Sequence, residues 1–435
     1  MEHSVKKNIL KTAGTMLACL LLSAVIGMLL LLGAYCLPAG PIDENVRKSA
    51  AVFREENTYR SIFSWCTSML DNFTDAYMLL EAADQTDGTL PERALLNYPG
   101  IDGRGPQEVL VSHYIDGKPL PGSIQYARYW HGYEILLKPL LYVTTYQGIR
   151  ILNGIAQGAL VLLICFLLFR RHLKRIIIPF ILTYLMLMPL ALAESLQFSA
   201  CFYVAMLAMI LLLSARRVKP FFVFLFAGIA TAFFDLSTYP VFTFGMPAVL
   251  YFVINPTKTF KEDIMNFLWI GFCWGVGYAG MWVMKWVAAS LITGRDIFSD
   301  ALNQLRARTS DVAQDEVTHV AYSECTFRNV LWFVRTPASI LAGCYCIWNC
   351  LPFSKRSTGK DYRNEDCGVR IFPYLLIAMV PFVWFALTIN HSYIHIFFVN
   401  KTLAVSFFAA TVWITGLYER IAHSRKAGRK MLPVE

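Results

Sequence analysis

The sequence predicts an all-α polytopic membrane protein with about ten transmembrane helices and two long extracytoplasmic loops. Of its 435 residues, 56% are hydrophobic and 16% are charged, and apolar runs long enough to cross a bilayer recur from end to end. Lys and Arg gather in alternate loops, as they do on the cytoplasmic side of membrane proteins. The net charge of +9 therefore indicates orientation in a membrane, and we expect no nucleic-acid partner.

The apolar runs set the boundaries of the predicted spans. The run at 240–254 is short and contains Gly245 and Pro247, so we expect it to be broken or tilted. The expected spans are 14–37, 147–169, 175–193, 197–214, 218–234, 240–254, 264–291, 330–351, 372–389 and 396–418.

Loop charge predicts that both termini are cytoplasmic. The short loops near 194, 235–239 and 390–395 contain no Lys or Arg, whereas the loops on the other side are basic. The expected organisation is 1–37 (cytoplasmic N-terminus and first span), 38–146 (first outer loop), 147–291 (spans two to seven), 292–329 (second outer loop), 330–418 (spans eight to ten) and 419–435 (basic cytoplasmic tail).

Two further expectations concern the outer side. The first span is long for a signal peptide, which favours an uncleaved anchor over cleavage after Ala34 or Ala39. Cys66 and Cys325 fall in the two outer loops and could pair, although spacing alone does not establish a disulfide.

Three cations, Lys285, Arg335 and Lys401, lie inside apolar spans near the predicted outer surface. A charge at the centre of a span costs roughly 2.5–3.5 kcal/mol, so it usually faces a cavity or a partner. We expect these three to form one anion site, of the kind that a lipid phosphate would occupy. The plainer alternative is that each long side chain reaches the near interface independently.

Asp71 and Asp75, in the sequence DNFTDAYML, are one helical turn apart. Ile62, Cys66, Met69, Phe73, Tyr77 and Leu80 recur at helical spacing around them, which predicts an amphipathic helix on the membrane. The two carboxylates could face water, or one could accept a proton from a hydroxyl or bind a divalent metal such as Mg or Mn.

The other candidate residues also lie at the predicted outer ends of spans. Arg128, Trp130 and His131 form either an interfacial belt or a platform for a phosphate and a sugar. Glu194 and Asp235 mark turns or line a site, and His391 and His395 are spaced as one face of a helix. That spacing without the Glu of HExxH is weak evidence for zinc.

This arrangement resembles the GT-C superfamily of membrane glycosyltransferases, which take sugars from polyprenyl-phosphate carriers. The resemblance lies in the first span, the outer loop bearing DNFTD, about nine further spans and a second outer loop. It implies that Asp71 or Asp75 is a catalytic base. The aspartates are four residues apart, whereas many members have adjacent acids or an Asp-x-Asp motif nearer the first span.

The resemblance implies a glycosyltransferase of the inner, or cytoplasmic, membrane. It would move a sugar from a polyprenyl-phosphate-linked donor to a cell-envelope glycan, lipid or protein on the extracytoplasmic face. The alternative from another class is a transporter or flippase for a lipid-linked or anionic substrate. An enzyme related to O-antigen polymerases or acyltransferases would share the outward chamber but would depend on an Arg or His.

Overall fold

A computed structural model of the chain describes residues 2–84, 88–96, 103–121, 126–214, 219–313, 318–350 and 371–416. The predicted basic tail, 419–435, and most of the basic loop before 371 lie outside these described residues. Within them the regular structure is helical, with only two isolated β-bridges. This confirms the all-α prediction.

Five described helices are long and apolar enough to cross a membrane, and the bent pair α15–α16 would make a sixth. This supports a multi-pass membrane protein but does not establish ten spans. The five spans are α1 (Glu2–Tyr35, apolar from Ile9), α7 (Tyr146–Arg170), α10 (Leu196–Ser214), α13 (Phe260–Thr293) and the segment Ile396–Gly416, which includes α19 (Ile396–Val399) and the 3-10 helix η2 (Asn400–Leu403).

The remaining predicted spans are shorter or broken. The predicted span 175–193 is interrupted at Met188, which has a left-handed backbone (φ 58°), and α15 and α16 meet at an angle of 92°. The predicted run 240–254 forms one continuous short helix despite Pro247. The bounds are η1 Lys174–Ile176, α8 Ile177–Met186, α9 Pro189–Glu194, α11 Pro220–Phe234, α12 Phe242–Ile254, α15 Tyr322–Val334, α16 Ala338–Cys350, α17 Ile371–Leu387 and α18 Ile389–Ile394.

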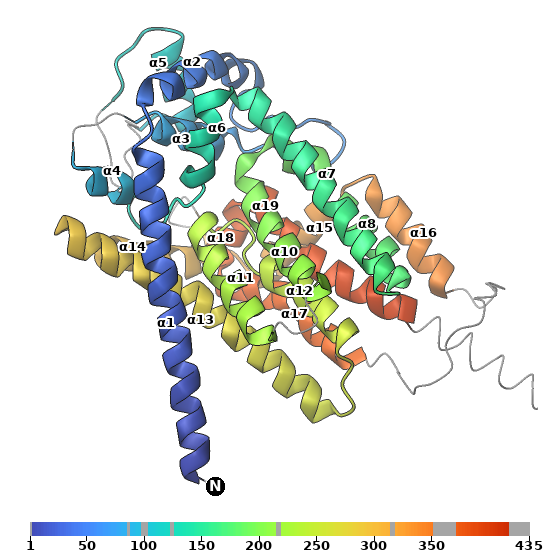
Figure 1. Ribbon diagram of the computed structural model, residues 1–435. Coiled ribbons are helices and arrows are strands. Elements are labelled where there is room, and N and C mark those ends of the chain that lie inside the picture. Colours follow the sequence, from blue (N-terminus) through green and yellow to red (C-terminus); the bar gives the residue numbers. More distant parts are fainter. Residues whose placement is uncertain are drawn as a thin grey trace, which may run out of the picture.

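The segment between α1 and α7 folds as a helical head at the end of the bundle away from the N-terminus (Figure 1). It consists of α2 (Ala39–Glu56), α3 (Asn72–Ala82), α4 (Leu90–Leu96), α5 (Pro106–Tyr114) and α6 (Glu134–Val143). In α2, Ile42, Val46, Ala50 and Phe53 are fully buried on one face and form the centre of the head's own core. The second outer segment contains α14 (Ile297–Thr309).

The amphipathic helix predicted from Ile62 to Leu80 is shorter than expected and differently placed. Helix α3 begins only at Asn72, where Asp71 caps it, and Ser61 instead pairs with Met69 in an isolated bridge. Both faces of α3 are buried, because it packs against α2, α5 and α6. The spacing therefore predicts a helix correctly for the second half of the segment. That helix is buried inside the head and does not lie on a membrane.

Helices α11 and α13 cross closely because each has a glycine at the contact. A Cβ on Gly228 would lie 2.1 Å from the backbone oxygen of Trp274, and one on Gly277 would lie 2.2 Å from that of Leu225. Small residues of this kind let helix backbones approach in membrane proteins. This crossing sets the position of the α13 face that carries Lys285.

We predict that Gly228→Ala destabilises the protein, because the added methyl group must push α11 away from α13. Overpacking of this kind typically costs about 1–3 kcal/mol, so the thermal midpoint in detergent should fall. Gly275→Ala is the matched control, because a Cβ there meets no atom within 4 Å. Equal midpoints for the two variants would contradict the close crossing.

Candidate functional site

The N-terminus of α10 is held by a carboxylate from the head. Asp75 accepts hydrogen bonds from the backbone nitrogens of Leu196 (2.8 Å) and Gln197 (3.1 Å) and from the hydroxyl of Tyr146 (2.5 Å). The first backbone N–H groups of a helix have no partner within it, and an anion there also interacts favourably with the helix dipole. Asp75 therefore accepts three hydrogen bonds and caps α10 from the head.

Asp71 lies at the same junction but has fewer contacts. Its backbone N–H donates to Ser195 Oγ (2.9 Å), and among the described residues its carboxylate accepts hydrogen bonds only from Thr74. The side chain is buried, and burial together with the charge of Asp75 raises the pKa of Asp71 to about 7. Burial also raises the pKa of Asp75, to about 6, so both aspartates can take a proton near neutral pH, but among the described residues fewer donors hold the Asp71 carboxylate.

The three span cations occupy different surroundings. Lys285 is buried, and its Nζ donates to the carbonyl of Leu95 (2.6 Å). Lys401 is buried with its Nζ 4.7 Å from the ring centre of Phe198, whereas Arg335 is exposed at the bend between α15 and α16. No contact joins any two of these cations within the described part of the chain.

The segment Arg128–His131 packs into the protein rather than presenting a platform. Arg128 pairs with Asp300 of α14 (3.1 Å). Trp130 is 1% exposed, and its indole N–H donates to the carbonyl of Met281 (2.7 Å), so it has no open face for stacking a sugar ring. His131 is equally buried. Only Arg128 of this segment keeps a partly exposed polar group.

Sequence reasoning did not select the acidic residues around His131. His131 Nδ1 lies 2.9 Å from Glu81, whose carboxylate also accepts from Tyr133. Glu134 is fully buried, neither of its carboxylate oxygens has a partner among the described residues, and burial and the charge of Glu81 raise its pKa. Lys138, one turn along α6, opposes that rise. These buried contacts join residues that are far apart in the chain, so the spacing of residues in the local sequence does not predict them.

The two histidines lie together, as their spacing predicts, with ring centres 4.9 Å apart. His391 Nε2 donates to the carbonyl of Ser237 (2.7 Å), and His395 Nε2 accepts from Arg308 of α14 (2.7 Å). Burial and the charge of Arg308 lower the pKa of His391 to about 3, so it is neutral. The described residues include no group of three His, Cys, Asp or Glu side chains that could hold a metal ion.

The remaining predicted residues lie at turns or in the core. Asp235 accepts from the backbone N–H (2.9 Å) and hydroxyl of Thr238 and so closes the turn after α11. Glu194 ends α9, where its backbone oxygen accepts from Tyr146. Cys66 and Cys325 are both free thiols, so the disulfide considered from sequence is not formed.

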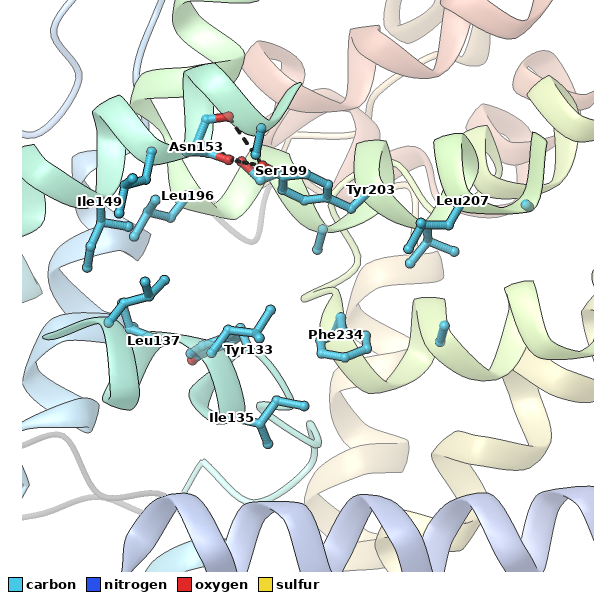
Figure 2. Close-up of a pocket in the computed structure, with 18 of the residues that line it drawn as sticks. Tyr133, Ile135, Leu137, Ile149, Asn153, Leu196, Ser199, Tyr203, Leu207 and Phe234 are labelled. Atoms are coloured by element: carbon cyan, nitrogen blue, oxygen red, sulfur yellow. Dashed lines mark hydrogen bonds between the residues drawn. The ribbon is translucent and has the colours of Figure 1, made fainter. Parts of the chain in front are cut away.

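An apolar cavity of about 800 Å³ lies next to this junction. Figure 2 shows it between α6, α7, α10 and α11, with Asn153 and Ser199 hydrogen-bonded on one wall (2.8 Å). Leu136, Leu152 and Leu207 line it and are also exposed, so the cavity reaches the protein surface there. Leu196 lines the cavity, while its own backbone N–H is bound by Asp75.

The cavity and the polar residues thus meet at α10. Comparison with family models, curated proteins and solved structures finds no match for this chain. Functional inference therefore rests on the contacts described above.

We predict that Asp75→Asn lowers stability more than Asp71→Asn does. An Asn side chain has one acceptor oxygen and an NH₂ group in place of the second oxygen, so it cannot accept from all three donors to Asp75 as the carboxylate does. Each unsatisfied buried group costs about 1–3 kcal/mol. Thermal unfolding of both variants in the same detergent measures the difference. A smaller loss for Asp75→Asn would mean that the carboxylate does not hold α10 to the head.

Proposed function

We propose that this chain is an integral membrane glycosyltransferase that moves a sugar from a polyprenyl-phosphate carrier to an acceptor on the extracytoplasmic face. The observation that carries the proposal is the junction at α10, where Leu196 lines an apolar cavity and the neighbouring Ser195 contacts Asp71, a buried carboxylate with few donors. A lipid-linked donor needs both features side by side, because its chain is apolar and its reacting end is polar. The cavity would take part of the chain.

Asp71 is the residue that we assign as general base. The acceptor hydroxyl would give its proton to the Asp71 carboxylate while its oxygen attacks the anomeric carbon of the donor. The bond from that carbon to the phosphate oxygen breaks, and polyprenyl phosphate leaves with the electron pair. Attack opposite the leaving group inverts the anomeric centre. We assign Asp75 to positioning Asp71 and α10, because three donors already hold its carboxylate.

Arg128 is the cation that we assign to the leaving phosphate. Lys285 is bonded to Leu95, Lys401 is enclosed against Phe198, and Arg335 lies at an exposed bend. Arg128 also has a partner, Asp300 (3.1 Å), but its Nε is buried without a partner among the described residues and its guanidinium lies over the ring of Tyr126 (4.2 Å). A fixed cation at a developing phosphate charge stabilises the transition state.

A flippase for a lipid-linked substrate is the second candidate, and the cavity favours it as much as it favours the enzyme. The two differ in what they need from Asp71, because moving a lipid across the membrane requires no proton acceptor at this position. The enzyme requires one.

We predict that Asp71→Asn lowers sugar transfer by at least about 100-fold, and that wild-type transfer rises as pH rises through about 7. The sign follows from the raised pKa of Asp71, since only the ionised carboxylate can accept the proton. The measurement is loss of sugar from a panel of polyprenyl-phosphate hexoses, using protein in nanodiscs with an envelope extract as acceptor.

Asp116→Asn is the matched control, because Asp116 is an exposed carboxylate paired with Arg54. Full activity in Asp71→Asn would remove Asp71 as the base. Movement of the intact donor between leaflets without any sugar loss would support the flippase.

We predict that Ala200→Phe raises the KM for a polyprenyl donor and changes kcat little, because the ring would fill the cavity that Ala200 lines. Ala410→Phe is the control, since Ala410 is exposed on the span Ile396–Gly416. If Ala200→Phe and Ala410→Phe both kept the wild-type KM, the donor chain would bind elsewhere.

A further inference from the structure

Five buried side chains each have a hydrogen-bonding atom without a partner among the described residues, and these atoms fall into two chemical groups. Trp282 Nε1 and Arg128 Nε can only donate, and the Tyr77 hydroxyl can donate. Gln197 Oε1 can only accept. His391 Nδ1 also accepts, because the carbonyl of Ser237 fixes the ring proton on Nε2. An unpartnered buried polar group is costly unless a ligand or water satisfies it.

The three donor groups lie around the rings of Tyr126 and Tyr129. Tyr77 lies 4.9 Å from the ring centre of Tyr126, over which the Arg128 guanidinium also lies at 4.2 Å. Trp282 lies 4.9 Å from Tyr129. The cation of this group is Arg128, which also pairs with Asp300 (3.1 Å). N–H and O–H groups with a guanidinium match the oxygens of a phosphate.

The acceptors lie beside the turn after α11. Gln197 is one helical turn before Cys201, whose thiol meets Thr238 at 3.6 Å, so Gln197 lies on the α10 face towards this turn. His391 is bonded to Ser237 of the same turn. Both atoms offer lone pairs and no proton. They match hydroxyl groups and do not match the oxygens of a phosphate.

One face of α13 connects the two groups. Tyr278 and Trp282 are one turn apart, and the hydroxyls of Tyr278 and Ser237 are 3.5 Å apart. Helix α14 makes a second connection, since its Arg308 donates to His395, whose ring contacts that of His391, and its Asp300 pairs with Arg128. The donors and the acceptors are thus adjacent along a continuous set of side chains.

We propose that these groups form the two ends of one head-group site: Trp282, Arg128 and Tyr77 bind a phosphate, and His391 and Gln197 bind the hydroxyls of an uncharged sugar. This inference rests on the proposed function and specifies its donor as a phosphate-linked neutral hexose. The sugar end lies at the junction of α10 with the head, because the backbone N–H of Gln197 donates to Asp75, one helical turn after Asp71.

Binding of two short probes, citronellyl phosphate and citronellyl-phosphoryl-glucose, tests this division without requiring turnover. Trp282→Phe removes one donor and should weaken both probes by the same factor, about three- to tenfold for one hydrogen bond. His391→Phe and Gln197→Met should weaken only the glucosyl probe, by a similar factor. Dissociation constants are measured by calorimetry on protein in nanodiscs.

Trp384→Phe is the matched control for Trp282→Phe, because Trp384 also has a buried, unpartnered indole N–H but lies on α17. It should bind both probes as wild type does. Because His391→Phe and Gln197→Met change the acceptor group independently, the test still holds if one of them fails to fold. If wild type binds both probes but the acceptor variants weaken both equally, or neither, the division is overturned while the donor class stands. If wild type binds neither probe, the proposed donor class fails as well.

Discussion

Asp75 joins the helical head to the membrane bundle by accepting two backbone N–H groups from α10 and the hydroxyl of Tyr146. Because all three donors point at one buried carboxylate, the end of α10 has a defined position relative to α3. Three neighbouring features depend on that position: Asp71 against Ser195, the cavity wall at Leu196, and the side chain of Gln197. Moving α10 by one residue would separate them.

The chemistry follows from what this capping leaves unsatisfied. Asp75 already accepts three hydrogen bonds, whereas the Asp71 carboxylate accepts only from Thr74 among the described residues, and burial raises the pKa of Asp71 to about 7. Gln197 gives its backbone N–H to Asp75 but keeps an unpartnered side-chain oxygen. One structural contact therefore leaves a proton acceptor and a hydroxyl acceptor on neighbouring parts of the protein, beside an apolar cavity.

The sequence predicted the helical membrane class and several spans because apolar runs carry that information locally. It could not predict which polar residues meet. Arg335 lies in an apolar run yet is exposed, since α15 and α16 bend by 92° there, and Trp130 looked interfacial but is a core side chain. Nothing in the sequence indicates a binding role for Gln197 or Trp282, because a single amide or indole side chain is common inside an apolar run. Their importance depends on contacts between distant segments.

The central claim is that the α10 junction holds the polar end of a lipid-linked sugar phosphate whose chain lies in the cavity. An experimental structure of the nanodisc-embedded protein with bound citronellyl-phosphoryl-glucose tests it most directly. The account predicts the chain between α6, α7, α10 and α11, the phosphate in hydrogen-bonding contact with Arg128, and the sugar beside His391 and Gln197. A ligand bound away from α10, or a sugar on the far side of the bundle from Asp71, would contradict it.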